Sequence, residues 1–175
     1  ECPLAKTKCP GKSPEEANEG IKKALEEQKK LLEKRKTELE KWDSSAQEDF
    51  KKWFGTTDEE ARTTIQKRID KVLEYNNNMT LDNFEAAEPP KDKEKNLYAY
   101  VYPFKDDKIY LGQSFCNSNF TGEDSKAGVL CHEMSHFLGT KDHVYGSSNA
   151  KKLAEKNSRK ALENADNFEY YCEDV

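Results

Sequence analysis

Apolar side chains recur along residues 13–42 with the spacing of a single stripe on a long α-helix, and lysine and glutamate occupy most of the positions between them. The stripe consists of Ile21, Leu25, Leu32, Leu39 and Trp42. A helix of this kind gains most of its stability from packing of its apolar face rather than from its own hydrogen bonds. The pattern therefore predicts a long helix that packs against other elements.

Two more helices are expected before residue 80. The aromatic stretch 50–54 is followed by Gly55, a residue type that commonly ends helices because it adopts the left-handed conformation without strain. Thr57 and Glu60 have the spacing of a capping box, which predicts the start of a further helix. This helix has an apolar face made by Ile65, Ile69 and Val72. Residues 1–80 are thus expected to form a helical N-terminal half.

The pattern changes from helix to strand at about residue 96. The segments 97–103 (LYAYVYP) and 108–112 (KIYLG) are rich in aromatic and β-branched residues, and a short turn separates them. This arrangement is typical of a β-hairpin. We therefore expect a small sheet in the second half of the chain.

Helices are expected again after the hairpin. Asp124 or Ser125 can cap a helix that runs to Leu138 and stops at Gly139. Two further helical segments, starting at about residues 148 and 158, close the chain. The whole pattern favours one α+β domain over residues 1–175, with a helical half at 1–80 and a half at 96–175 that holds the sheet and the later helices.

Composition and charge argue against nucleic acid and membranes as binding partners of this protein. The net charge of −5 and the pI of about 5.4 argue against nucleic acid, because phosphate binding requires an excess of basic side chains. No apolar run approaches the roughly eighteen residues that cross a bilayer. Charged residues make up 36% of the chain and hydrophobic residues 34%, so the core is modest for its length. We expect a monomer that binds neither nucleic acid nor membrane.

The cysteines favour a secreted protein. Five cysteines are more than a cytosolic chain of this length needs, and the chain also has two N-glycosylation sequons, Asn78-Met79-Thr80 and Asn119-Phe120-Thr121. The odd number leaves one thiol unpaired in any scheme of disulfides. A bond between Cys2 and Cys9 is sterically easy, and Cys131 is expected to be a buried thiol or the partner of Cys116.

All three histidines of the chain lie in the segment HEMSHFLGTKDHVYG at 132–146. On a helix, His132 and His136 project from one face and can bind one metal ion, with Glu133 beside them. A catalytic zinc site typically has two histidines, a third protein ligand and one open position for water. In such sites a glutamate accepts a proton from the attacking water. The residues after Gly139 offer two candidates for the third ligand, Asp142 and His143.

The motif HEMSH followed by GTKDHVYG resembles the signature of the aspzincin metallopeptidases, in which H-E-x-x-H precedes G-T-x-D-x-x-Y-G. Further stretches make the chain most similar to the secreted peptidyl-Lys metalloendopeptidases, namely WFG at 53–55, AYVYP at 99–103, DSKAG at 124–128 and NADNFEYY at 164–171. The resemblance implies an α+β zincin-like fold with an active-site helix at HExxH. It implies a secreted zinc endopeptidase that binds one zinc ion and acts on polypeptides.

The resemblance also assigns roles to residues. It implies zinc ligands at His132, His136 and Asp142, a general base at Glu133, and a hydrogen-bond donor to the oxyanion at Tyr145. The chain departs from the usual pattern, because only Phe137 and Leu138 separate the second histidine from the Gly-Thr pair. This short spacer keeps His143 as an alternative third ligand.

The resemblance implies cleavage on the amino side of lysine, with Asp166 and Glu169 forming an acidic pocket for the lysine ammonium. The two residues share a helix face and each follows a residue of an apolar stripe, so they lie at the edge of a buried surface. Two alternatives remain. One is a broader, deuterolysin-like specificity, in which these acids are structural. The other is a helical binding protein whose zinc site is vestigial.

Overall fold

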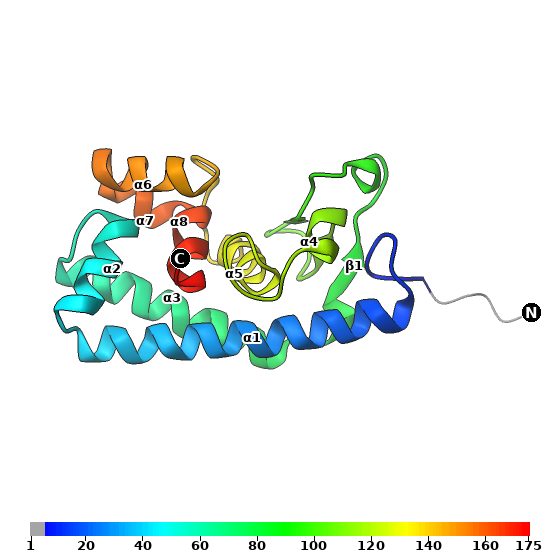
Figure 1. Cartoon of the computed structure of the whole chain (residues 1–175), viewed down its shortest axis with the longest axis horizontal. Coiled ribbons are helices and arrows are strands. Elements are labelled where there is room, and N and C mark those ends of the chain that lie inside the picture. The colour runs from blue at the N-terminus through cyan, green and yellow to red at the C-terminus, as the bar shows by residue number, and fades with distance from the viewer. Residues whose placement is uncertain (1–5) are drawn as a thin grey trace, which may run out of the picture.

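Three helices build the N-terminal half of the molecule, as the apolar pattern predicts. The computed structural model describes residues 6–175, and its first helices are α1 (Pro14–Lys41), α2 (Ser44–Phe54) and α3 (Glu59–Asn78). Helix α1 extends along nearly the whole length of the molecule, with α3 against it (Figure 1). Its stripe residues Ile21, Leu32 and Leu39 are almost fully buried, so the amphipathic pattern correctly identifies the buried face.

The N-terminus of α3 differs from the expectation. Asp58, not Thr57, is the capping residue, and its carboxylate accepts a hydrogen bond of 2.8 Å from the amide of Ala61. The prediction that Thr57 and Glu60 form a capping box is therefore wrong. A carboxylate one position further along satisfies the free amide of the first turn and also suits the positive end of the helix dipole.

The sheet contains the predicted hairpin and one strand that the sequence pattern missed. Strands β2 (Ala99–Val101) and β3 (Ile109–Leu111) pair antiparallel, as expected for the hairpin. The additional strand β1 (Phe84–Ala86) pairs parallel with the other side of β3, with Phe84 opposite Ile109, so the strand order is β1-β3-β2. Strand β2 therefore lies at an edge of the sheet. Short 3₁₀ turns, η1 (Leu81–Asn83) and η2 (Lys91–Lys93), flank β1.

Helix α5 (Lys126–His136) follows the short helix α4 (Gln113–Asn117) and carries the HExxH motif. Ser125 caps α5 through a hydrogen bond of 3.1 Å from the amide of Gly128 to the Ser125 hydroxyl. The helix ends at His136, earlier than expected, and the chain turns away at Gly139, where φ is +94°. None of the helices between residues 6 and 175 is both long and apolar enough to cross a membrane.

Three helices, not two, close the chain: α6 (Ser147–Lys156), α7 (Ser158–Glu163) and α8 (Ala165–Glu173). The expected segment from residue 158 is interrupted at Asn164, whose extended backbone separates α7 from α8. Helix α8 packs closely against α5, and its residues from Ala165 to Glu173 are all buried. Figure 1 shows α5 near the centre of the molecule, with α1 below it and α8 beside it.

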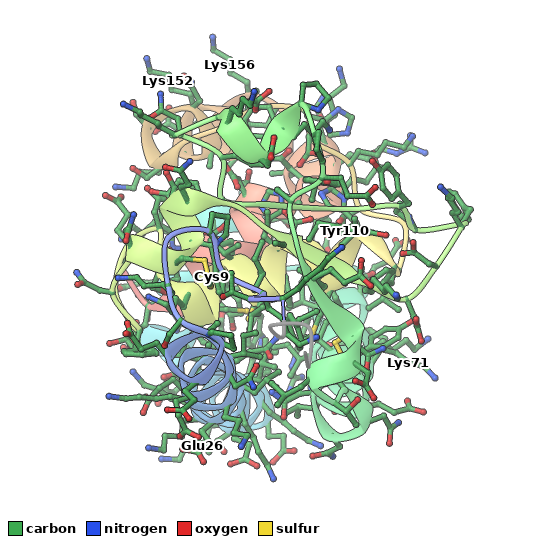
Figure 2. All side chains as sticks on the ribbon, turned by 90° about the vertical axis from the view of Figure 1, so that its right-hand side faces the viewer. Cys9, Glu26, Lys71, Tyr110, Lys152 and Lys156 are labelled. Atoms are coloured by element: carbon green, nitrogen blue, oxygen red, sulfur yellow. A yellow bond between two sulfur atoms is a disulfide. The ribbon has the colours of Figure 1, made fainter. Side chains whose placement is uncertain are left out.

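Among residues 6–175, a disulfide joins Cys9 to Cys116, and it ties the N-terminal segment to α4. This pairing excludes the suggested bonds of Cys9 with Cys2 and of Cys116 with Cys131; Cys2 itself lies outside the described residues. Cys131 is a buried free thiol, which is the first of its two expected states. Cys9 and Cys116 are both buried. Figure 2 labels Cys9, with the yellow sulfur atoms of the bond beside it, and shows Lys71, Lys152 and Lys156 at the outer edge of the molecule.

Candidate metal centre

His132, His136 and Asp142 meet at one point. The Nε2 atom of His132 lies 3.1 Å from Oδ1 of Asp142, and Nε2 of His136 lies 3.2 Å from the same oxygen. The two imidazoles project from neighbouring turns of α5, and the turn after Gly139 brings the aspartate back to them. The short spacer therefore does not prevent Asp142 from reaching both histidines.

The other nitrogen of each imidazole faces an acceptor. Nδ1 of His136 lies 2.9 Å from the carbonyl oxygen of Thr140, and Nδ1 of His132 lies 2.7 Å from Oδ1 of Asp166. The second contact is close, although the direction of the ring N–H does not satisfy a hydrogen bond. Acceptors at Nδ1 leave Nε2 of each ring free to bind a metal ion.

These residues fit a zinc ion. One atom from each of His132, His136 and Asp142 lies within 4.8 Å of the others, as metal ligands do. Two imidazole nitrogens and a carboxylate oxygen are a ligand set of catalytic zinc sites, which leave a fourth position open. His143 lies outside this group: its Nε2 atom is 3.3 Å from Oε2 of Glu163.

The charges of the site favour the ionised carboxylate of Asp142. Burial by itself raises the pKa of Asp142, but hydrogen bonds from His132 and His136 outweigh this effect and hold that pKa well below its usual range. Burial by itself lowers the pKa of His132, but the carboxylates of Asp142, Asp166 and Glu169 more than offset it and raise that pKa. The cluster thus concentrates negative charge around the imidazoles, which suits a divalent cation.

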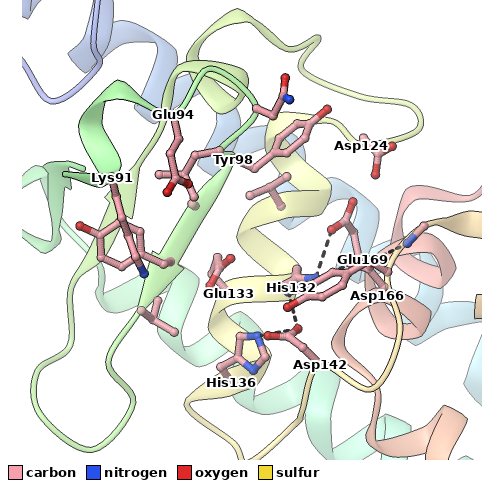
Figure 3. Close-up of a pocket in the computed structure, with 18 of the residues that line it drawn as sticks. Lys91, Glu94, Tyr98, Asp124, His132, Glu133, His136, Asp142, Asp166 and Glu169 are labelled. Carbon is pink, nitrogen blue, oxygen red and sulfur yellow. Dashed lines mark hydrogen bonds and ion pairs between the residues drawn. The ribbon is translucent and has the colours of Figure 1, made fainter. Parts of the chain in front are cut away.

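Glu133 and Tyr145 line the same cavity, which has a volume of about 770 Å³. Glu133 is buried, and burial raises the pKa of its carboxyl although the charges of His132 and His136 oppose the shift. Tyr145 is 63% exposed and lies at the rim. Burial and then the charge of Asp142 raise the pKa of the Tyr145 phenol. In Figure 3, Glu133 faces the cavity beside His132.

Two buried residues at the start of α8 hold the loop that carries Asp142 and Tyr145. The Oδ1 atom of Asn164 accepts a hydrogen bond of 2.8 Å from the amide of His143. The Oδ2 atom of Asp166 accepts another of 2.8 Å from the amide of Gly146. Asn164 was not singled out from the sequence, where its position between two helical segments was the available signal.

Asp166 and Glu169 lie where the cavity meets α8. Both are buried and line the cavity, and Oε1 of Glu169 lies 3.4 Å from Nδ1 of His132. The structure adds Asp124 and Glu173 to this acidic group, because one oxygen from each of Asp124, Glu169 and Glu173 lies within 4.8 Å of the others. Burial and the neighbouring charge of Glu169 raise the pKa of Glu173 to about 11.

Residues 39–173 match the sequence family of the aspzincins, described as lysine-specific metallo-endopeptidase. The chain belongs to this family. The resemblance seen in the motifs HEMSH and GTKDHVYG is thereby confirmed.

Several proteins similar to this aspzincin are named as peptidases. A peptidyl-Lys metalloendopeptidase from Armillaria mellea is 40% identical over 124 residues, which cover 69% of this chain and 34% of the relative. An extracellular protease from Aeromonas hydrophila is 37% identical over 129 residues, which cover 72% of this chain and 36% of the relative. The chain of this aspzincin therefore spans about a third of the length of these two relatives.

A solved structure supports the fold. A zinc peptidase from Grifola frondosa superposes with a TM-score of 0.77 and 29% sequence identity, over 93% of this chain and 96% of that one. This likeness confirms the α+β, zincin-like fold expected for an aspzincin, with its helical N-terminal half and small sheet.

Proposed function

We propose that this aspzincin is a secreted zinc endopeptidase that hydrolyses polypeptides on the amino side of lysine. The observation that carries the proposal is the convergence of His132, His136 and Asp142 at one wall of a cavity that Glu133 also lines. Secretion is supported by the Cys9–Cys116 disulfide and by the name of the extracellular protease from Aeromonas hydrophila.

His132, His136 and Asp142 would hold the zinc ion, which would supply Lewis acidity and lower the pKa of the attacking water toward about 7. Glu133 is the proton carrier of the proposed mechanism. Its carboxylate takes a proton from the attacking water and delivers a proton to the amine that leaves when the peptide bond breaks. Burial raises the pKa of Glu133, which brings its proton affinity closer to that needed for both transfers.

Tyr145 stabilises the charge that develops on the scissile carbonyl. Its phenol has a raised pKa, so the hydroxyl keeps its proton at neutral pH and can donate a hydrogen bond to the oxyanion. Tyr145 lies three residues after Asp142 on the loop that Asn164 and Asp166 anchor. The loop thus positions a metal ligand and the proposed oxyanion donor together.

The sheet edge offers a place for the substrate backbone. Strand β2 lies at the edge of the sheet, and Ala99, Tyr100 and Val101 all line the cavity that contains Glu133. An extended peptide can add to such an edge through main-chain hydrogen bonds. We infer that the substrate lies along β2, with its scissile bond near Glu133.

Acidic side chains support the lysine preference. Asp166 and Glu169 are both buried and line the cavity, and a carboxylate in a partly enclosed site favours an ammonium over a neutral side chain. The name of the relative from Armillaria mellea refers to the same specificity. Lysine therefore occupies the position just after the cleaved bond in the proposed complex.

The test is to incubate the zinc-loaded protein with a denatured, unrelated polypeptide and to identify each new N-terminus by mass spectrometry. Lysine at nearly all of them is the expected result. Mixed residues would retain the peptidase and reject the lysine preference. Absence of cleavage despite bound zinc would favour the non-catalytic binding protein.

Two variants assign the roles in this assay. Glu133→Ala is expected to bind zinc and to lose turnover, because its proton carrier is missing. Asp142→Ala is expected to lose zinc. Normal turnover by Glu133→Ala would reject the proposed mechanism.

A further inference from the structure

Two buried thiols lie side by side behind the metal-binding helix, and the proposed mechanism uses neither of them. Cys131 immediately precedes His132 on α5, and Cys172 belongs to α8. Both cysteines are free, and each residue is 0% exposed. Burial raises the pKa of the Cys131 thiol, and a side-chain contact with the thiol of Cys172 raises it further. The two sulfur atoms are therefore neighbours in the core.

The antiparallel packing of α5 and α8 accounts for this contact. Near the end of α5, Nδ1 of His132 lies 3.4 Å from Oε1 of Glu169. At the start of α5, the amide of Ser125 donates a hydrogen bond of 2.9 Å to Oε2 of Glu173. Cys172 lies between these two acids in the sequence of α8, so it faces the part of α5 that comes just before His132.

The other cysteines of the described chain are already paired. Cys9 is bonded to Cys116, which leaves Cys131 and Cys172 as the two free thiols among residues 6–175. The side chain of Cys131 is also held in place, because Nε2 of the buried Gln28 donates a hydrogen bond of 3.8 Å to its sulfur. Disulfides form and persist in oxidising compartments, so an environment that oxidises the first pair also favours oxidation of a second pair in contact.

We propose that Cys131 and Cys172 form a second disulfide, which joins the metal-binding helix to α8. The oxidant is a small-molecule disulfide such as oxidised glutathione. The sulfur of one cysteine attacks the oxidant and releases one glutathione thiol, and the sulfur of the other cysteine then displaces the second. Two cysteine S–H bonds and the S–S bond of the oxidant break, while one protein S–S bond and two glutathione S–H bonds form. Two electrons and two protons thus pass to the oxidant.

The bond would support the metal site from behind. His132 follows Cys131 directly, and α8 also carries Asp166, whose Oδ2 accepts a hydrogen bond from the amide of Gly146 in the loop that holds Asp142. A covalent link between α5 and α8 beside His132 therefore keeps the proposed zinc ligands together when other parts of the molecule loosen. The inference itself does not depend on peptidase activity.

Peptide mapping of the wild type tests the pairing directly. Because both thiols are buried in the folded protein, the experiment starts from the reduced, unfolded chain. This chain is refolded with zinc and a mixture of oxidised and reduced glutathione and is then quenched with acid. Free thiols are alkylated in denaturant with a chelator present, and the chain is digested with trypsin, which places each of the five cysteines in a separate peptide.

The expected product is a link between peptides 127–141 and 161–175, which contain Cys131 and Cys172, with a mass two hydrogens below the sum of the two. The link between Cys9 and Cys116 in the same digest is the internal control, and the oxidant is increased until this control bond has formed. Alkylation of both Cys131 and Cys172 at that point overturns the inference. A bond of either residue to Cys2 in place of the bond between them also overturns it.

Variants add a second readout. Cys172→Ala is expected to leave Cys131 alkylated and the bond between Cys9 and Cys116 intact. In a chain that combines Cys9→Ala with Cys116→Ala, the link between Cys131 and Cys172 should still form. Reduction of this double variant should lower its midpoint of urea unfolding by about 1 M or more, because the unfolded chain is then no longer cross-linked. Equal midpoints before and after reduction reject the cross-link.

Discussion

Asp166 holds its Oδ1 atom 2.7 Å from Nδ1 of His132, on the side of the imidazole opposite the contact with Asp142. Because Oδ2 of the same carboxylate binds the amide of Gly146, a single side chain of α8 joins the HExxH helix to the loop that carries Asp142. The orientation of one proposed ligand and the position of another therefore depend on the same residue.

Replacing Asp166 with asparagine is expected to weaken zinc binding by about 10- to 100-fold, because carboxylates behind a metal-bound histidine orient the ring and increase its basicity. Competition with a chelator of known affinity measures this change. Asp82→Asn removes a charge from an exposed 3₁₀ turn and serves as the control. Equal zinc affinity in Asp166→Asn and the wild type would rule out the positioning role.

Tyr145→Phe removes the proposed oxyanion donor and keeps the ring. We expect kcat to fall by about 10²- to 10³-fold with little change in KM, because the hydrogen bond strengthens in the transition state. Zinc content should stay the same. Steady-state kinetics on a lysine peptide provide the measurement, and Tyr102→Phe, on the hairpin outside the cavity lining, is the matched control. An unchanged kcat would remove Tyr145 from the mechanism.

Glu173→Gln tests the buried carboxyl behind the cavity. The pKa of Glu173 is raised from an ordinary value of 4.5 to about 11, so between these values the folded protein keeps a proton that the unfolded chain loses. The free energy of unfolding should therefore fall as pH rises through this window, by at most about 1.4 kcal/mol per pH unit. The variant lacks the titrating group and should show a shallower fall.

Urea unfolding at about pH 6 and at about pH 9 gives the change in the free energy of unfolding with pH for each protein. This slope can be compared between the variant and the wild type even if their absolute stabilities differ. Glu123→Gln, at an exposed position, should retain the slope of the wild type. Identical slopes for Glu173→Gln and the wild type would show that Glu173 titrates normally.

Cys116→Ala removes a disulfide that closes a long loop, since its two cysteines are 107 residues apart. The free energy of unfolding should fall by about 2–5 kcal/mol, because the unfolded chain gains conformational entropy when the bond is absent. Denaturant unfolding gives the value. Reducing agent should lower the stability of the wild type more than that of the variant, which lacks this bond; a variant as stable as the oxidised wild type would contradict the prediction.

The sequence predicts those parts of the fold that depend on local periodicity. The stripe from Ile21 to Leu39 identifies the buried face of α1, and the aromatic alternation around Tyr100 identifies the hairpin, because each pattern repeats within its own element. The HExxH spacing places His132 and His136 on one helix face for the same reason.

Features that depend on distant partners could not be predicted in this way. Strand β1 is short, and it pairs with β3 across about two dozen residues of intervening chain, so its local pattern is too weak to separate it from a loop. The partner of Cys9 is set by where α4 packs. Asp124 and Glu173 join the site because α8 packs against the start of α5, which the spacing of residues does not reveal.

Helix α1 also affects how long an enzyme of the proposed specificity would survive among its own copies. It presents many lysines to solvent, but their backbone amides are bonded within a helix of 28 residues, and an edge strand accepts extended chain. A turn of α1 must unwind in one molecule before another molecule can cleave it at these lysines. The packing of the buried face of α1 limits such unwinding. The lifetime of the concentrated enzyme would then follow its local unfolding, so a stabilised variant should also digest itself more slowly.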